Sequence, residues 1–196
     1  MDKKLGYYWI LLSCFLWSNP SAASEQDSIQ VYLFLAEQCP ISQYYTRPLR
    51  QLYEQFAQQD VQFLGIFSNP DATAKGMAHF QEKYQLPFDL ILDKTQRKME
   101  QFSVRVTPEV VVVQGTNQRV IYQGRIDNTY FRVGRRRTVT TTSELRDVLQ
   151  ALTVGSSAVA FAKTQAVGCL ITKANAILRN AVMCQPTSIK DTGTPN

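Results

Sequence analysis

The chain has 196 residues, of which 44% are apolar and 19% are charged, and its formal net charge is +5. A chain of this length and composition can bury a substantial core, which excludes a disordered protein and favours one globular domain. The charge is too small to predict nucleic-acid binding. The dense basic run from Arg135 to Arg137 has no interleaved aromatic residues, so we interpret it as a solvated loop.

The beginning of the chain has the layout of a secretory signal peptide over residues 1–23. A short basic start precedes the apolar run LGYYWILLSCFLW, and small polar residues follow. We expect cleavage between Ala23 and Ser24 and export, most simply to a bacterial periplasm. The apolar run is short for a transmembrane helix, so no membrane span is expected after cleavage. A lipoprotein anchor at Cys14 ranks below simple export, because the apolar run continues beyond it.

After this segment, strand patterns alternate with helix patterns. Runs of β-branched and aromatic residues predict strands at residues 28–36, 61–68, 88–93, 110–113 and 119–124. A Gly/Asn turn between the last two strands predicts a hairpin.

Helices are predicted between these strands. The first covers residues 42–59 and contains Pro48, which is expected to kink the helix or divide it in two. The second follows a cap at Asp71 or Thr73, and a short third helix covers residues 95–102.

A fourth helix is predicted from Thr141, where Glu144 three residues later resembles a capping box. The order β-α-β-α-β-α-β-β-α predicts the α/β class, with a central mixed sheet flanked by helices on both faces. We expect one domain over residues 24–155 and a tail over residues 156–196, where the pattern weakens.

Four cysteines are present, and three remain if Cys14 leaves with the signal: Cys39, Cys169 and Cys184. Disulfides persist outside the cytosol, so an odd number leaves one thiol unpaired within the chain or paired elsewhere. The spacings match no zinc finger, and there is no C-x-x-C-H run for haem attachment. No metal or cofactor is therefore expected. His79, the single histidine, is interpreted as a surface or half-buried residue rather than a catalytic one.

Cys39 stands where the first predicted strand ends and a helix begins. Unpaired backbone N–H groups and the positive end of the helix dipole stabilise a thiolate at such a position. Because the thiolate is the nucleophile in both disulfide exchange and peroxide reduction, Cys39 is predicted to be the reactive residue.

Four segments in order carry a family resemblance: CPISQYYTRPLRQLYEQFAQQDVQFLGIFS, VRVTPEVVVV, YQGRIDNTY and KTQAVGCLI. Together they resemble exported redoxins of the thioredoxin-like superfamily, in the group of alkyl hydroperoxide reductases and thiol-specific antioxidant proteins. The resemblance spans about Gln30 to Ile171 and implies a thioredoxin-like fold. It also implies a cis peptide between Thr107 and Pro108, where the proline lies against Cys39 and leaves room for a partner's backbone.

The motif Cys39-Pro40-Ile41-Ser42 departs from that of a dithiol oxidoreductase, because serine replaces the second cysteine. A disulfide within the motif is therefore impossible. Ser42 suits the first turn of a helix and can donate a hydrogen bond to the thiolate.

Two positions disfavour efficient peroxide reduction. A peroxidase of this group needs a hydroxyl residue three positions before its cysteine and a proline further upstream, and Ala36 and Tyr32 stand there. Arg125 is the candidate for the arginine that such a peroxidase needs near its thiolate. Asp127 is expected to pair with Arg125 or to cap a turn.

Three redox schemes are open for Cys39. It could act as a monothiol through mixed disulfides, it could be resolved by Cys169, or it could pass through a sulfenic acid. A structural Cys169–Cys184 disulfide is weighted equally with a Cys39–Cys169 pair, because sequence does not give the geometry.

These observations favour an exported thiol–disulfide oxidoreductase that acts on protein thiols or disulfides and needs an exported reductant. Two alternatives are an antioxidant peroxidase of the peroxiredoxin type and a non-catalytic binding or assembly domain that kept only the fold.

Overall fold

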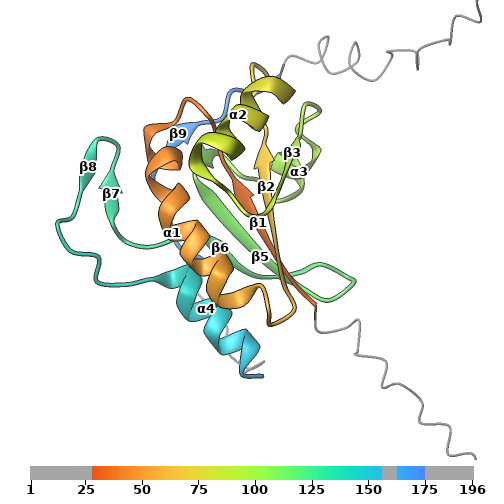
Figure 1. The fold of residues 1–196 in the computed structure, drawn as a ribbon, viewed down its shortest axis with the longest axis vertical. Coiled ribbons are helices and arrows are strands. Elements are labelled where there is room, and N and C mark those ends of the chain that lie inside the picture. Colours follow the sequence, from red (N-terminus) through yellow and green to blue (C-terminus); the bar gives the residue numbers. More distant parts are fainter. Residues whose placement is uncertain (1–27, 156–162, 175–196) are drawn as a thin grey trace, which may run out of the picture.

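The computed structural model describes residues 28–155 and 163–174 (Figure 1). The expected signal peptide, the Cys14 position and Cys184 lie outside these residues. The helices are α1 (Pro40–Phe56), α2 (Ala74–Tyr84), α3 (Arg97–Gln101) and α4 (Glu144–Thr153). The strands are β1 (Ile29–Phe34), β2 (Val61–Phe67), β3 (Asp89–Leu92), β4 (Val106–Thr107), β5 (Glu109–Gln114), β6 (Arg119–Gly124), β7 (Tyr130–Arg132), β8 (Arg135–Arg136) and β9 (Cys169–Leu170).

Five strands form one mixed sheet in the order β3-β2-β1-β5-β6. β1 is central and pairs in parallel with β2 and in antiparallel with β5. β3 runs parallel to β2, and β6 forms a hairpin with β5. The Gly115 carbonyl accepts from the Gln118 amide in the hairpin turn, at 3.0 Å. The predicted mixed sheet and hairpin are confirmed.

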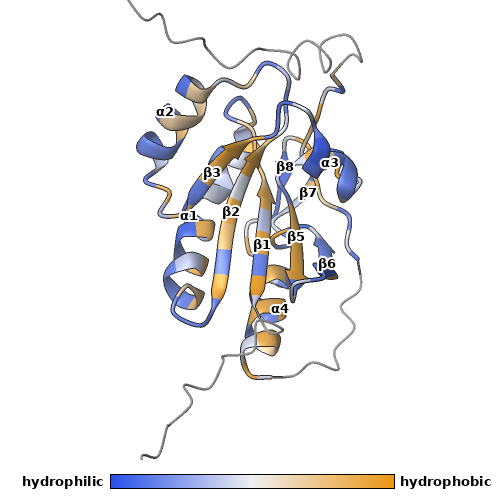
Figure 2. Ribbon diagram, turned by 90° about the vertical axis from the view of Figure 1, so that its right-hand side faces the viewer, coloured by the Kyte–Doolittle hydropathy of each residue, from blue (hydrophilic) through white to orange (hydrophobic). Residues whose placement is uncertain are grey.

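Successive side chains of a strand point to opposite faces of the sheet, and β1 shows this clearly. Val31 and Leu33 belong to a core with residues of α1, α2 and α4. Tyr32 and Phe34 belong to a second core with residues of α3 and with Ile171. The apolar colouring of the sheet strands in Figure 2 reflects this burial on both sides. Helices therefore cover both faces, as the sequence predicts.

Helix α1 runs through Pro48 without division, which excludes one of the two effects expected of this proline. Tyr45, Leu49 and Leu52 on either side of the proline are buried in the core. Their packing offsets the backbone hydrogen bond that a proline removes.

The predicted N-cap of α2 at Thr73 is confirmed, and the predicted capping box at the start of α4 is wrong. The Thr73 side chain accepts a hydrogen bond from the Gly76 amide, at 3.0 Å. Helix α4 begins only at Glu144, after Ser143, with no side-chain cap. The Glu144 carboxylate accepts from Arg125 and from the Thr142 hydroxyl instead, so it does not close a capping box.

Residues 163–174, called the C-terminal segment below, pack onto the domain rather than forming a separate tail. β9 pairs with β4, and Ile171 is buried beside α3. This part of the expected tail over residues 156–196 thus lies against the domain. Its β9 strand was not predicted, because two residues carry no readable periodicity.

The basic run Arg135 to Arg137 lies on the exposed β7–β8 hairpin, where two of its residues form a short strand instead of a loop. Its three arginines are exposed, in agreement with the prediction of a solvated segment. In the part of the chain that the structure describes, no helix is long and apolar enough to cross a membrane.

Candidate active site

Cys39 lies at the N-terminus of α1, just beyond the end of the central strand β1. It is the N-cap residue in extended conformation, and its carbonyl accepts the first helical hydrogen bond from the Gln43 amide, at 3.0 Å. Pro40 follows at the start of the helix, where its missing N–H costs nothing. Ser42 is fully buried, and its hydroxyl accepts from the Ala36 amide at 3.3 Å, which fixes the turn before the helix.

Thr107 faces Cys39 from the other side of the site. The peptide bond between Thr107 and Pro108 is cis, as the resemblance implies. In its thiol form, Cys39 donates a hydrogen bond from Sγ to the Thr107 carbonyl oxygen, with the two atoms 3.1 Å apart. Both cysteine and threonine are 1% exposed.

Cys169 approaches the same point from the C-terminal segment. In the antiparallel pair β4–β9, Cys169 is the partner of Thr107 and Leu170 is the partner of Val106. Gly168 makes this approach possible, because a Cβ there would lie 2.0 Å from the Thr107 carbonyl oxygen. The fold thus brings together two cysteines that are 130 positions apart in the sequence.

The two thiols shift each other's pKa in opposite directions. Burial raises the pKa of Cys39, but hydrogen bonds from the Cys169 thiol and from the Ser42 and Cys169 backbone N–H groups outweigh it and lower the pKa. Burial and the hydrogen bond and charge of Cys39 raise the pKa of Cys169 to about 12. The Thr107 carbonyl favours the protonated form of Cys39, but it is outnumbered by these donors. Of the two thiols, Cys39 is therefore the one that ionises first, and Cys169 is the one that holds its proton to higher pH.

A pocket of about 360 Å³ lies beside the two cysteines. Its walls come from the ends of β1 and β2, from the residues after them, and from β9. The lining residues are Ala36, Gln38, Cys39, Asn69, Pro70, Asp71, Cys169, Leu170 and Thr172. The pocket gives a partner group access to the site.

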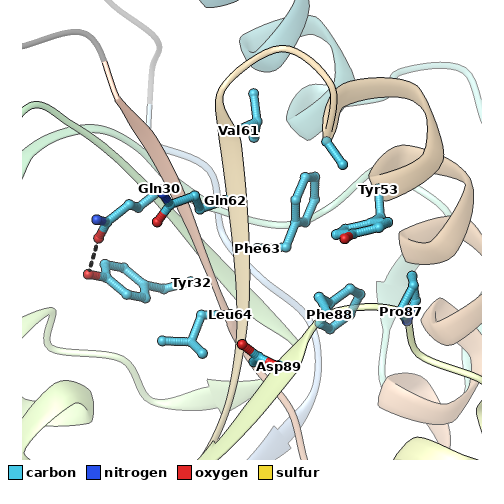
Figure 3. A pocket seen from close by; sticks show the side chains of 11 residues that line it. Gln30, Tyr32, Tyr53, Val61, Gln62, Phe63, Leu64, Pro87, Phe88 and Asp89 are labelled. Atoms are coloured by element: carbon cyan, nitrogen blue, oxygen red, sulfur yellow. Dashed lines mark hydrogen bonds between the residues drawn. The ribbon is translucent and has the colours of Figure 1, made fainter. Parts of the chain in front are cut away.

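A larger pocket, of about 500 Å³, lies at the opposite end of β1 and β2 (Figure 3). Figure 3 shows the aromatic rings of Tyr53, Phe63 and Phe88 gathered on one side of β2 and Tyr32 on the other. Its lining includes no cysteine and one acidic residue, Asp89. Since thiol chemistry needs the cysteines, we assign the site to the pocket beside Cys39.

Comparison with known proteins agrees with this geometry. The family model described as AhpC/TSA matches residues 20–140, more than half of the chain. The chain belongs to the AhpC/TSA family. Membership of this redoxin family supports a thiol–disulfide or peroxiredoxin-like role in general terms. None of the curated proteins compared with the chain matches it.

Solved structures share the fold at low sequence identity. A hypothetical protein from Sinorhizobium meliloti 1021 is 19% identical, with a TM-score of 0.64 over 75% of this chain and 80% of that one. An uncharacterized conserved protein from Geobacillus kaustophilus is 23% identical, with a TM-score of 0.66 over 78% and 80%. A Neisseria meningitidis protein assigned as a thioredoxin is 15% identical, with a TM-score of 0.50 over 70% and 83%. The fold is thioredoxin-like.

Arg125, the arginine expected near the thiolate of a family peroxidase, is engaged elsewhere. Its Nε and Nη2 both donate to Glu144 Oε1, the former at 2.9 Å. This hydrogen bonding raises the pKa of Arg125. Burial raises the pKa of Glu144, but the hydrogen bonds from Arg125, Thr142 and the backbone together outweigh it and lower that pKa. The groups that lower the Cys39 pKa are Cys169 and Ser42. Arg125 thus stabilises the start of α4 rather than the thiolate.

Asp127 caps a turn, which is one of the two alternatives expected from the sequence. Its carboxylate accepts from the Thr129 amide at 2.7 Å and from the Tyr45 hydroxyl, not from Arg125. His79 is exposed on α2, as predicted.

Two residues that line the pocket were missed in the sequence, namely Asn69 and Asp71. They follow β2 in a stretch that was interpreted only as a turn with a possible helix cap. Because the carboxyl ends of neighbouring parallel strands meet at one edge of a sheet, residues after β2 must lie close to Cys39 after β1. That rule would have found them.

Proposed function

We propose that this protein is an exported thiol–disulfide oxidoreductase in which Cys39 and Cys169 alternate between two thiols and one disulfide. The observation that carries the proposal is the position of Cys169, opposite Thr107, whose carbonyl accepts from Cys39. The mutual pKa shifts support the same pairing. Of the schemes open to Cys39, resolution by Cys169 is thus the one we favour.

In the reduced form Cys39 is the thiolate and therefore the nucleophile that closes the disulfide. It attacks Cys169 when that sulfur is bonded to a partner, and the partner's sulfur leaves with the electron pair and takes a proton. The Ser42 and Cys169 backbone N–H groups stabilise the Cys39 thiolate before this step. Pro40, Thr107 and Pro108 shape the surroundings of the sulfur.

The chemistry is tested by the disulfide map of the exported protein. Mass spectrometry of the oxidised protein is expected to yield a peptide pair joined through Cys39 and Cys169. Cys39→Ser and Cys169→Ser should each abolish exchange with a small disulfide, while Cys184→Ser should not. A Cys169–Cys184 disulfide with Cys39 free would overturn the proposal and favour a binding domain.

Export is supported by the basic, apolar and small-residue stretches of residues 1–23. A mature N-terminus at Ser24 in the periplasmic fraction is the expected result of N-terminal sequencing. Cys14→Ser should leave processing unchanged, because Cys14 is removed with the signal. Retention of the protein in the cytosol would contradict export.

A peroxidase is the main alternative within the family. Ala36 stands where such an enzyme has its hydroxyl residue, and the structure uses the Ala36 amide as a donor to Ser42. We therefore favour disulfide exchange.

A further inference from the structure

The two sulfurs of the site differ in exposure and in the pKa of their thiols, and both differences affect which sulfur a partner attacks. We propose, on the basis of the proposed function, that a protein dithiol reduces the Cys39–Cys169 disulfide by attacking Cys169 and expelling Cys39. Cys169 is then the sulfur that forms the mixed disulfide with the partner. Cys39 exchanges only inside the protein.

Exposure is the first reason. Both cysteines line the pocket, but Cys39 is 1% exposed, whereas Cys169 is half-buried on the short strand β9 next to the exposed Leu170. The rate of disulfide exchange depends on which sulfur a thiolate can reach. Cys169 is the more exposed of the two cysteines, and we expect a partner thiolate to reach it first.

The C-terminal segment is held in place, so Cys39 is not uncovered easily. Gly168 lies against the Thr107 carbonyl. The Ile171 amide donates to the Arg105 carbonyl at 2.9 Å, and the Thr172 carbonyl accepts from Gln96 Nε2 at 2.6 Å. These contacts keep the segment packed beside Cys39 and restrict the approach of a partner thiolate to the Cys39 sulfur.

The leaving group is the second reason. In disulfide exchange the sulfur with the lower thiol pKa leaves faster. When Cys169 is bonded to a partner its thiol no longer donates to Cys39, but Ser42 and the Cys169 backbone N–H still stabilise the Cys39 thiolate. Burial is the largest cause that raises the pKa of Cys169, and it acts whether or not Cys39 is charged. Attack on Cys169 expels the stabilised thiolate, and attack on Cys39 would expel the poor leaving group.

The step is balanced in atoms and electrons. A partner thiolate forms a bond with Cys169 Sγ, the bond between the Cys39 and Cys169 sulfurs breaks, and its electron pair stays on Cys39. The partner's second thiolate then attacks the partner sulfur bonded to Cys169 and expels Cys169, which takes up a proton. The partner is oxidised to a disulfide, and this protein is reduced to the dithiol.

Trapping with glutathione tests the direction of attack. The exported protein carrying Cys184→Ser is oxidised, mixed briefly with glutathione, quenched in denaturing acid, and alkylated with a maleimide before peptide mapping. Glutathione has no second thiol with which to complete the reduction, and the acid quench protonates Cys39 before it can expel glutathione again, so the mixed disulfide is captured. Glutathione on Cys169 and the alkyl group on Cys39 are the expected result.

The other outcomes count against the proposal in distinguishable ways. Glutathione on Cys39 overturns the direction of attack and leaves the proposed function standing. A Cys39–Cys169 disulfide that forms but does not react with glutathione also overturns it, because Cys169 is then inaccessible. Failure of that disulfide to form removes the proposed function itself, and this proposal with it.

Single-cysteine variants give an independent measurement. Cys39→Ser and Cys169→Ser are each combined with Cys184→Ser, loaded with glutathione on the remaining cysteine, and reduced with dithiothreitol. The glutathione on Cys169 should be released at least about tenfold faster than that on Cys39, because access limits exchange. In denaturant the two rates should converge. Equal rates in the folded proteins would contradict the proposal.

Discussion

Cys169 lies directly opposite Thr107 in the antiparallel pair β4–β9. The Thr107 carbonyl also accepts a hydrogen bond from the Cys39 thiol, so one buried residue contacts both cysteines of the candidate redox pair. The pairing therefore depends on how closely β9 can approach β4. This dependence can be tested at the residue next to Cys169.

Gly168→Ala should separate the two strands. A Cβ at this position would lie 2.0 Å from the Thr107 carbonyl oxygen, and backbone atoms cannot yield as a flexible side chain does. We expect a loss of about 1–3 kcal/mol in unfolding free energy, typical of overpacking, and a much smaller fraction of Cys39–Cys169 disulfide. Urea unfolding and peptide mapping measure the two effects.

Gly134→Ala is the control for this change. Gly134 lies at the tip of the β7–β8 hairpin with positive φ, and a Cβ there meets nothing within 4 Å. The Gly134→Ala substitution therefore introduces backbone strain without a steric clash, away from the site. An equal loss of the disulfide in both variants would contradict a specific role for Gly168.

Ser42→Ala should raise the pKa of Cys39. The variant keeps the Ser42 backbone N–H but removes the hydroxyl that contributes to the low pKa of the thiol. It also leaves the buried Ala36 amide without its acceptor, at a cost of about 1–3 kcal/mol. The pH dependence of Cys39 alkylation in a Cys169→Ser background measures the shift, and an unchanged profile would exclude the hydroxyl as a stabilising group.

The stability of the reduced protein should pass through a maximum near pH 8.5, the ordinary pKa of a thiol. The lowered pKa of Cys39 makes stability rise with pH up to that point, because the unfolded chain still holds a proton that the folded one has lost. Above it, the raised pKa of Cys169 makes stability fall towards pH 12, because only the unfolded thiol ionises. The two trends have opposite signs.

Urea unfolding at several pH values measures this dependence, with the double variant Cys39→Ser, Cys169→Ser as the reference for all other groups. The difference between the two proteins should change by at most about 1.4 kcal/mol per pH unit for each thiol. A difference that does not vary with pH would show that neither thiol is shifted.

Arg125→Gln should change stability without changing the thiol. Its guanidinium is bound to Glu144 at the start of α4, and this contact is partly buried. We expect a loss of about 1 kcal/mol, since a hydrogen bond to a charged group is removed, and an unaltered rate of Cys39 alkylation. A slower alkylation of Cys39 with an unchanged free energy of unfolding would show that Arg125 acts on the thiolate after all.

The main sheet and the position of Cys39 were predictable because both rest on local signals. Strand patterns and the Cys-Pro start of α1 identify the end of β1 within a few residues. The contact of Cys169 with the site was one of two equal alternatives, since it depends on a two-residue strand and on Gly168 packing against a distant carbonyl. Neither feature produces a periodic pattern of apolar residues from which it could be predicted.

Arg125 and Glu144 illustrate the same limit. The family resemblance made Arg125 the candidate for an arginine near the thiolate, and the local pattern indicated a capping box at Glu144. In the folded chain the two charges lie side by side and satisfy each other. This tertiary ion pair is the reason that neither expectation held.

Gln96→Ala should uncover Cys39. The Gln96 side chain donates to the Ser68 and Thr172 carbonyls and accepts from the Ala174 amide, so it fastens the end of the C-terminal segment to the residues after β2 and β3. Without it the segment should detach more often, and Cys39 should become accessible more often. We expect the alkylation rate of Cys39 to rise several-fold in a Cys169→Ser background, measured at neutral pH in the folded protein.

General destabilisation must be separated from this local effect. Thr73→Ala removes the cap of α2, away from the C-terminal segment, and should cost about 1 kcal/mol. If opening of the C-terminal segment controls access, Thr73→Ala leaves the alkylation rate of Cys39 unchanged although the protein is less stable. If both variants raise the rate in proportion to their loss of stability, Cys39 is reached only through global unfolding, and the C-terminal segment is not a separate barrier.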